Sequence, residues 1–207
     1  MQRLFGLFTA FACLSMAIGC GVMATKQEWS DNYALMEGVR ATSPAMIDGN
    51  VRTMGETAFP EGSQGYAGVS PASEAIITFP DKKTIRRIVI HAENLQEFDV
   101  FADKGNGDWR VIKEFNSVKT NPVDFTVVTA FPTDRIRIRV LATSDDAEVR
   151  RQQRARSGGS DRFSGNRRAP GKINEIEIYG YKTGEEAATE KVEEQRESEL
   201  DELLKLN

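Results

Sequence analysis

Strict alternation of charged and aliphatic residues is the feature that most limits how this chain can fold. The segment 135–140 reads RIRIRV, and 173–179 reads INEIEIY with the same two-residue period. Similar short runs occupy 73–79, 84–91, 97–102, 109–115 and 125–129. A two-residue period places alternate side chains on opposite faces of a strand, one buried and one wet. The sequence therefore predicts an all-β fold, an antiparallel β-sandwich or barrel, with Trp109 and the Ile and Val residues of 135–140 in its core.

Composition supports one domain with polar extensions. The 207 residues are 28% charged and 40% hydrophobic, which suits a single hydrophobic core. The net charge is −4, so the chain has no electrostatic bias toward nucleic acid, and we do not expect nucleic acid as a partner.

Residues 1–19 have the features of a signal peptide. Arg3 precedes an apolar run at 4–18, which is shorter than the roughly 20 apolar residues of a transmembrane helix. The run ends in Ala17-Ile18-Gly19-Cys20, which resembles a bacterial lipobox, and the other cysteine, Cys13, lies within the segment that cleavage would remove. We therefore predict lipidation at Cys20, a lipidated linker over 20–32 and attachment to a membrane of the bacterial cell envelope, the outer membrane if the host has one. An ordinary secreted protein with an unpaired thiol is the alternative.

Two polar segments have compositions unlike that of the strands. Residues 144–172 carry seven arginines among Gly and Ser, at 150, 151, 154, 156, 162, 167 and 168. Such a segment buries too little apolar surface to offset its ordering entropy, so we predict a long disordered insertion that begins with a helical turn around 147–154. Residues 183–207 are acidic and contain no Gly or Pro after Gly184, which predicts a solvated helix or a frayed tail.

Four motifs, in this order, resemble those of the discoidin family, also called the coagulation-factor C-type domain. They are ATSPAMIDGNVRT at 41–53, TIRRIVIH at 84–91, DKGNGDWRVI at 103–112, and DRIRIRV followed by INEIEIYG at 134–140 and 173–180. The family has the galactose-binding-like jelly-roll fold and is similar to family 32 carbohydrate-binding modules. The resemblance covers residues 33–182 and implies a jelly-roll β-sandwich there. One departure is Gly55, which stands where the family usually has a tryptophan.

The same resemblance implies a structural Ca²⁺ site around Asp48. In many family members the loop that corresponds to residues 45–53 wraps this ion. Calcium takes about six to eight oxygen ligands, several of them backbone carbonyls. The mapped ligands are the carboxylates of Asp48 and Glu175, the hydroxyl and carbonyl of Thr53, and the carbonyls of Ala45, Asn50 and Asn174. The alternative is an Asx turn closed by Thr53 without a metal.

The function that the resemblance implies is non-catalytic binding of a carbohydrate, such as a glycan or an envelope polysaccharide. Sugar sites combine an aromatic platform with planar polar groups. The candidates near the expected loop end are Arg52, Phe59, Tyr66, His91, Glu93 and Asn94. Structural roles for the single histidine and for the two aromatic residues are the alternative.

We do not expect enzymatic activity, because the chain has one histidine and nothing in it suggests a nucleophile with a partnered base. A second hypothesis is an envelope scaffold or interaction lipoprotein that binds an anionic surface or protein through the arginine-rich insertion. The insertion as a solvated loop without a partner is the alternative to that hypothesis.

Overall fold

The computed structural model describes residues 27–61, 72–128, 130–156 and 167–184, together with residues 192, 196 and 205. The predicted signal peptide, Cys20, Tyr66 and most of the acidic tail lie outside these residues. In the described part of the chain, no helix combines the length and the apolar character needed to cross a membrane.

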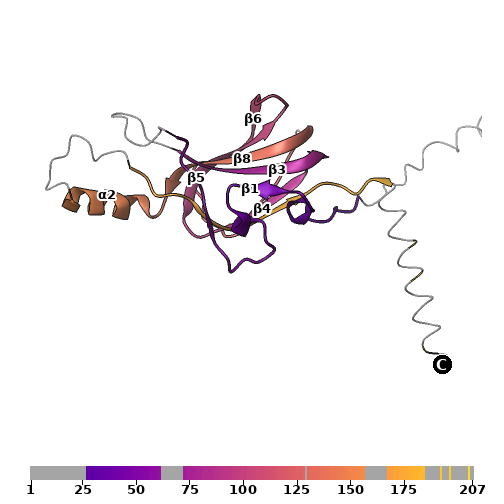
Figure 1. The fold of residues 1–207 in the computed structure, drawn as a ribbon, viewed down its shortest axis with the longest axis horizontal. Helices are drawn as coiled ribbons and strands as arrows, with labels where there is room; N and C mark the ends of the chain where they lie inside the picture. Colours follow the sequence, from indigo (N-terminus) through magenta and orange to yellow (C-terminus); the bar gives the residue numbers. More distant parts are fainter. Residues whose placement is uncertain are drawn as a thin grey trace, which may run out of the picture.

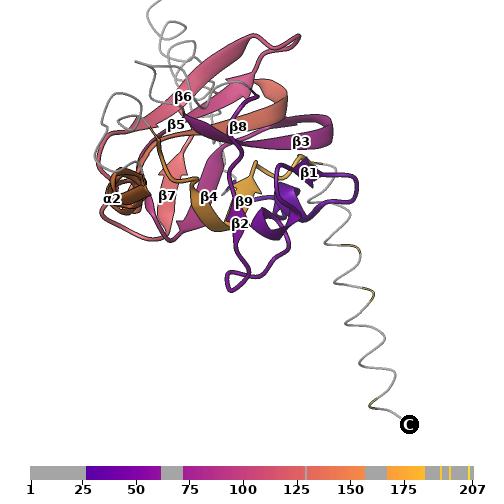
Figure 2. The ribbon, with the colours of Figure 1, turned by 60° about the vertical axis from the view of Figure 1, so that its left-hand side comes forward.

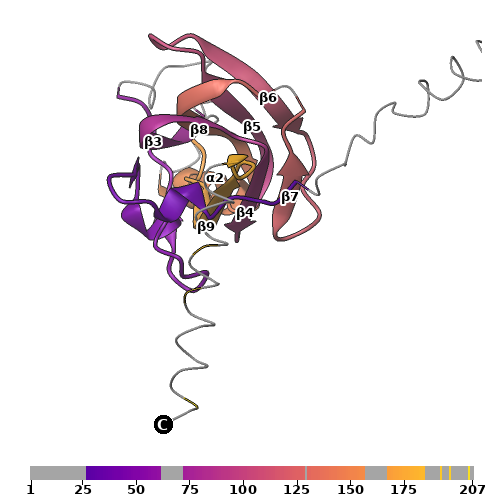
Figure 3. The same ribbon diagram turned by 90° about the vertical axis from the view of Figure 1, so that its right-hand side faces the viewer.

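Two antiparallel sheets enclose the core between them (Figure 3). The five-stranded sheet has the order β1 (Arg40–Ala41), β3 (Ser73–Thr84), β8 (Pro132–Thr143), β5 (Leu95–Asp103) and β6 (Trp109–Phe115). The four-stranded sheet, whose strands lie in a row in Figure 2, has the order β2 (Gly55–Glu56), β9 (Lys172–Tyr179), β4 (Arg87–Ala92) and β7 (Val123–Thr126). Because β3 lies beside β8 and β4 beside β9, strands distant in sequence are neighbours, as in a jelly roll. The predicted antiparallel β-sandwich is confirmed.

Alternation along the strands places the aliphatic side chains inside. On β8, Ile136, Ile138 and Val140 are buried, and the arginines between them lie on the outer face. Ile88 and Ile90 of β4 face them from the other sheet and are also fully buried. Each of the seven segments predicted as strands overlaps a strand between β3 and β9. The two-residue period therefore indicated both the strands and their buried faces.

Trp109 is a correction, because it is half-buried on the outer face of the five-stranded sheet and not in the core. Its ring centroid lies 4.4 Å from the guanidinium carbon of Arg137 and 5.4 Å from that of Arg135. The Phe101 ring lies 4.6 Å from the same Arg137 carbon. These cation–π contacts explain the position, because Trp109 begins an edge strand whose outer neighbours are arginines.

Helix α2 (Asp146–Arg156) contains the helical turn predicted around 147–154, but it shows that the first part of the predicted disordered insertion over 144–172 is ordered. The buried Asp146 carboxylate accepts hydrogen bonds from the N–H and hydroxyl of Thr143, the Arg168 guanidinium and the Ala169 N–H, at 2.9–3.2 Å. This network fixes both ends of the insertion to the sandwich. Figure 1 shows α2 projecting from one end of the molecule. Residues 157–166 of the predicted insertion lie outside the described residues.

The two ends of the described sandwich meet at the opposite end of the molecule from α2. The Ser30 N–H donates to the Gly180 carbonyl at 3.1 Å, and the Gly180 N–H donates to Ser30 Oγ at 2.9 Å. Trp29 and Tyr181 stack beside this pair, with ring centroids 5.0 Å apart. In Figure 1 the yellow end of β9 lies on the right and α2 on the left. We call the contacts of Ser30, Gly180, Trp29 and Tyr181 the terminal clasp.

Gly55 occupies the position where the resembling family usually has tryptophan, and other side chains fill that space. A Cβ atom on Gly55 would lie 2.6 Å from Met46 Cγ and 2.7 Å from Ser43 Oγ. Met46 belongs to the short helix η2 (Pro44–Met46) and is fully buried. Methionine is flexible and fills irregular gaps well, and Met46 fills the space beside Gly55.

We expect Gly55→Ala to lower the free energy of unfolding by about 1–3 kcal/mol, because the added methyl overpacks this contact. Urea denaturation measures the change. Gly184→Ala is the control, because no atom lies within 4 Å of the added Cβ, and its effect should be smaller than about 0.5 kcal/mol. Equal stability of the two variants would contradict the tight packing of Met46 on Gly55.

Candidate functional site

The loop 45–53 gathers oxygen atoms around the Thr53 hydroxyl. Thr53 Oγ1 lies 2.8 and 2.9 Å from the two Asp48 carboxylate oxygens, 2.7 Å from the Asn50 carbonyl and 3.5 Å from the Ala45 carbonyl. Gly49 has φ +76°, a left-handed conformation that turns the chain sharply between Asp48 and Asn50. A hydroxyl has one proton, so it can donate to only one of these four acceptors. The other acceptor oxygens around this hydroxyl receive no proton from it. Together with the negative charge of the Asp48 carboxylate, their lone pairs suit a hard cation.

Glu175 brings a second carboxylate to this loop from β9. Its Oε2 accepts a hydrogen bond from the Gly49 N–H at 3.1 Å, and its Oε1 is buried without a hydrogen-bond partner. The side chain is only 2% exposed. Burial, reinforced by the nearby Asp48 carboxylate, raises the pKa of Glu175 to about 7. An orphaned, buried carboxylate oxygen of this kind is what a metal ion would satisfy.

A β-bulge shapes the β9 side of the same site. In the pairing of β4 with β9, His91 pairs with Glu175 and Ala92 with Ile173, so Asn174 has no partner in that ladder. The unpaired position leaves the Asn174 backbone adjacent to Glu175 and outside the regular pairing. The predicted ligands Ala45, Asp48, Asn50, Thr53 and Glu175 are therefore brought together from two distant segments.

This oxygen set fits calcium better than it fits a transition metal. Among the described residues, no group of three or more His, Cys, Asp or Glu side chains is placed to hold a metal. The site has two carboxylates, and its other oxygens belong to a hydroxyl and backbone carbonyls. Calcium accepts such mixed oxygen ligands, whereas zinc and copper sites use His and Cys.

A second feature is a cleft at the α2 end of the molecule, with a volume of about 410 Å³. It lies between β2, the start of α2 and the segment that precedes β9. Its polar lining residues are Glu56, Asp145, Glu148 and Lys172, and its apolar ones are Val149, Ala169 and Pro170. The Asp145 carboxylate and the Lys172 ammonium are 2.9 Å apart. The hydrogen bond to Lys172 lowers the pKa of Asp145, and the same bond raises the pKa of Lys172, so both groups stay charged.

Asn94 forms part of the scaffold of this cleft. Its amide nitrogen donates to Asp145 Oδ2 and to the Pro170 carbonyl, both at 3.1 Å, and its oxygen accepts from the Lys172 N–H at 2.7 Å. Both amide hydrogens and the oxygen are used, and the residue is 4% exposed. Asn94, which was predicted to contact ligand, holds three segments of the cleft together through these bonds.

The other predicted ligand contacts do not form one site. Glu93 is exposed next to Asn94, and Phe59 is half-buried beyond β2. Arg52 is exposed in the loop 45–53. His91 lies on the outer face of the four-stranded sheet, where its Nε2 is 3.0 Å from Glu177 Oε1. Tyr66 lies outside the described residues. Of the six candidates, the structure places Glu93 and Asn94 beside the cleft.

Sequence reasoning missed the cleft residues Glu56, Asp145, Glu148 and Lys172. Three of them lie within the segment 144–172, which was predicted to be disordered. The available signal was Ser144-Asp145-Asp146 followed by Glu148, because such residues are typical of a helix start.

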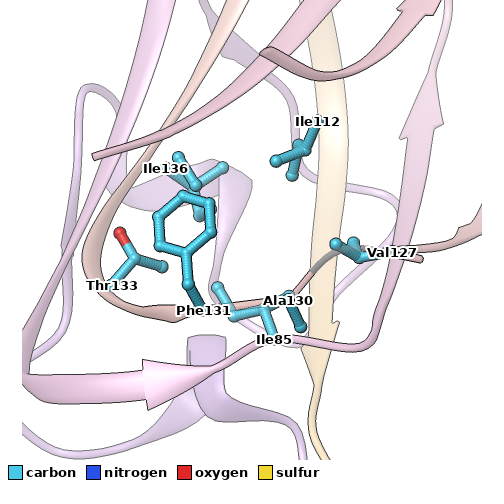
Figure 4. A pocket seen from close by; sticks show the side chains of 8 residues that line it. Ile85, Ile112, Val127, Ala130, Phe131, Thr133 and Ile136 are labelled. Atoms are coloured by element: carbon cyan, nitrogen blue, oxygen red, sulfur yellow. The ribbon is translucent and has the colours of Figure 1, made fainter. Parts of the chain in front are cut away.

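A small apolar cavity in the core is not a ligand site. Its volume is about 10 Å³, and Figure 4 shows the side chains of Ile85, Phe131 and Ile136 around it, with Thr133 nearby. Such a space is about as large as one water molecule and offers almost no polar partner, so it stays dry.

Comparisons with known proteins find similarity in structure only. No family model matches the chain, and no curated protein sequence matches it. Chitosan-binding module 1 from the chitosanase/glucanase of Paenibacillus sp. IK-5 is 16% identical, covers 73% of this chain over 100% of its own, and has a TM-score of 0.49. The family 32 carbohydrate-binding module of C. perfringens NanJ, in complex with galactose, is 16% identical, covers 73% of this chain over 99% of its own, and has a TM-score of 0.48.

A third neighbour is chitosan-binding module 2 of the same Paenibacillus enzyme, in complex with chitotriose. It is 16% identical, covers 72% of this chain over 100% of its own, and has a TM-score of 0.48. These neighbours are carbohydrate-binding modules, the class to which the sequence motifs are similar. With TM-scores below 0.5, the fold assignment rests on the two sheets of this chain and the functional argument rests on its own residues.

The raised pKa of Glu175 gives a testable pH dependence in chelator. The folded state holds the Glu175 proton more tightly than the unfolded state, so the metal-free domain should lose stability as the pH rises from about 4.5 to about 7. Calcium should restore that stability by neutralising the carboxylate. Melting temperatures from pH 4.5 to 8, with EDTA or with calcium, measure both effects.

The variant Glu175→Gln should remove the calcium response and should be more stable than the parent chain in EDTA at pH 8. Glu114→Gln, on the exposed edge strand β6, is the matched control and should leave both curves unchanged. A calcium response that survives in Glu175→Gln would show that this carboxylate is not a ligand.

Proposed function

We propose that the chain is a non-catalytic carbohydrate-binding module that holds its ligand in the cleft at the α2 end. The observation that carries the proposal is the cleft itself, which lies at the opposite end of the molecule from the terminal clasp and presents charged, hydrogen-bonding side chains. Open clefts with a few placed polar groups are typical of small-ligand sites.

The cleft chemistry suits sugar hydroxyls. Asp145 and Glu56 offer carboxylate oxygens that accept hydrogen bonds, and Lys172 offers an ammonium that donates them. Hydrogen bonds to charged groups are stronger than neutral ones. Val149 and Pro170 supply apolar surface for the C–H face of a ring.

Calcium has a structural role in this proposal. The ion would join the loop 45–53 to β9 through Asp48, Thr53 and Glu175, close to where β2 and β9 pair. Such a link stabilises the sheet whose β2 edge borders the cleft. It supplies no chemistry to the ligand.

Attachment to the cell envelope is also part of the proposal. The lipobox-like sequence ending at Cys20 supports it. The terminal clasp holds the start of the described chain at the end opposite to the cleft. A lipid at Cys20 would then orient the cleft away from the membrane.

The second candidate function is binding of an anionic partner through the arginine-rich segment. The specific observation in its favour is that α2 is an anchored helix that projects with exposed arginines. Arginine pairs well with carboxylate and phosphate groups.

A glycan array with residues 21–207, run with calcium and with EDTA, tests the carbohydrate proposal. The probes include galactose and chitotriose, the sugars named for two of the structural neighbours. For a ligand that binds, Glu56→Gln combined with Lys172→Ala should weaken the affinity about tenfold or more, because two charged hydrogen-bonding groups are lost.

The control for the cleft variant is Glu114→Gln combined with Lys119→Ala, which makes the same charge change on exposed residues distant from the cleft lining. Isothermal titration at two salt concentrations completes the test. If the affinity for a neutral sugar does not change with salt concentration, binding in the cleft is supported. If the affinity falls steeply as the salt concentration rises, the arginines carry the binding. Absence of any bound glycan would contradict the proposal.

A further inference from the structure

The cleft at the α2 end carries more negative than positive charge. Its described lining contains three carboxylates, those of Glu56, Asp145 and Glu148. The cation of this lining is the ammonium of Lys172. Glu148 also forms a 3.1 Å ion pair with Arg151, whose side chain is 77% exposed, so solvent screens that pair. Even when Arg151 is counted with the lining, the carboxylates outnumber the cations.

Three carboxylates converge on Lys172, the first residue of β9. In the register of the sheet Lys172 lies opposite Glu56 of β2. On its other side the Glu93 N–H, just after β4, donates to the Lys172 carbonyl at 3.0 Å. The Asp145 carboxylate lies 2.9 Å from the Lys172 ammonium. The hydrogen bond to Asp145, and then the charges of Glu56 and Glu93, raise the pKa of Lys172, so the three negative charges act at one place.

Glu56 and Glu93 keep hydrogen-bonding capacity for a ligand. Lys172 is engaged by Asp145, and the exposed Glu56 side chain forms no ion pair or hydrogen bond with another described residue. Glu93 is also exposed and accepts one long hydrogen bond, from the Asn174 amide at 3.4 Å. A carboxylate in this position gains most from a ligand that brings a charged N–H donor.

The charge balance of the cleft separates three classes of sugar. A uronic acid would bring a carboxylate next to like charges, which opposes its binding. A neutral sugar would form hydrogen bonds but would leave the excess negative charge in place. A sugar with a protonated amine offers a positive charge and three N–H donors, and its ring can lie on the apolar surface of Val149 and Pro170. The cleft is therefore complementary to an amino sugar.

We propose that the cleft selects sugars that carry a free, protonated amino group. Glu56 is the principal acceptor for this group, and Glu93 adds negative potential beside it. Asp145 and Lys172 keep the ion pair that holds the cleft segments together. The inference rests on the proposed carbohydrate-binding function, because it names the ligand class of the same cleft.

Isothermal titration of residues 21–207 with two matched pairs of sugars tests the inference. One pair is the trimer of glucosamine and its N-acetylated form, and the other is galactosamine and N-acetylgalactosamine. Acetylation removes the charge of the amine and keeps the stereochemistry of the ring. At about pH 6 the free amines are protonated. The amine member of a pair should then bind about tenfold or more tightly than the acetylated member.

The variant Glu56→Gln separates charge from size, because glutamine keeps an acceptor oxygen and loses the negative charge. It should lower the affinity for the amine sugar about tenfold and that for the acetylated sugar by a smaller factor, so that the two affinities converge. Glu93→Gln should have an effect in the same direction but smaller. Glu114→Gln, on the exposed edge strand β6, makes the same charge change and should keep the full preference. Circular dichroism and the melting temperature report folding of each variant.

The outcomes distinguish this inference from the proposed function. Equal affinities within each pair, both weakened by Glu56→Gln combined with Lys172→Ala, would overturn the amine preference and leave the carbohydrate-binding function in place. A preference that survives in Glu56→Gln overturns the inference, as does tighter binding of a galacturonic acid trimer than of the amine sugars. If neither amine sugar binds, the inference fails, and a neutral glycan bound on the array would still support the proposed function.

Discussion

The rest of the structure depends on the pairing of β9, the last described strand of the chain, with the other strands of the four-stranded sheet. β9 lies between β2 and β4, so the four-stranded sheet is incomplete without it. It also receives the first part of the chain: the Ile178 N–H donates to Asn32 Oδ1 at 2.9 Å, and Glu175 accepts from the Gly49 N–H. Residues more than 120 positions apart are joined in this way. Such non-local pairing must wait for loop closure, so the sandwich forms as one cooperative unit.

The two functional features flank β9. The oxygen-rich loop 45–53 meets it at Glu175, and the cleft lies where β9 begins, at Lys172. Asn94 and Thr57 connect these regions through hydrogen bonds to the backbone of Lys172 and Gly171. The cleft is therefore built on a strand that is held along its length, which limits its freedom to change shape. A pre-organised site loses less entropy when a ligand binds.

The sequence predicted the strands whose residues alternate with a two-residue period. RIRIRV and INEIEIY fix strand positions and buried faces by alternation, and β8 and β9 match them. Trp109 was misplaced because alternation on an edge strand does not say which face is inward. The length of α2 was underestimated because its composition lacks an apolar stripe, and its order comes from the Asp146 network, which joins segments more than twenty residues apart. The Asp48–Thr53 pairing followed from a local motif, whereas the cleft needed three separate segments that no local pattern connects.

The terminal clasp has a mechanical consequence. The Ser30–Gly180 and Glu28–Lys182 backbone hydrogen bonds join two antiparallel segments that leave the sandwich in the same direction. Tension between the two ends of the chain would act across these bonds in turn and peel them apart one at a time, without loading the strands in shear. The Glu28–Lys182 bond would break first, and the rings of Trp29 and Tyr181 would separate next. The clasp would therefore open at a low force while the strands of the sandwich remain paired.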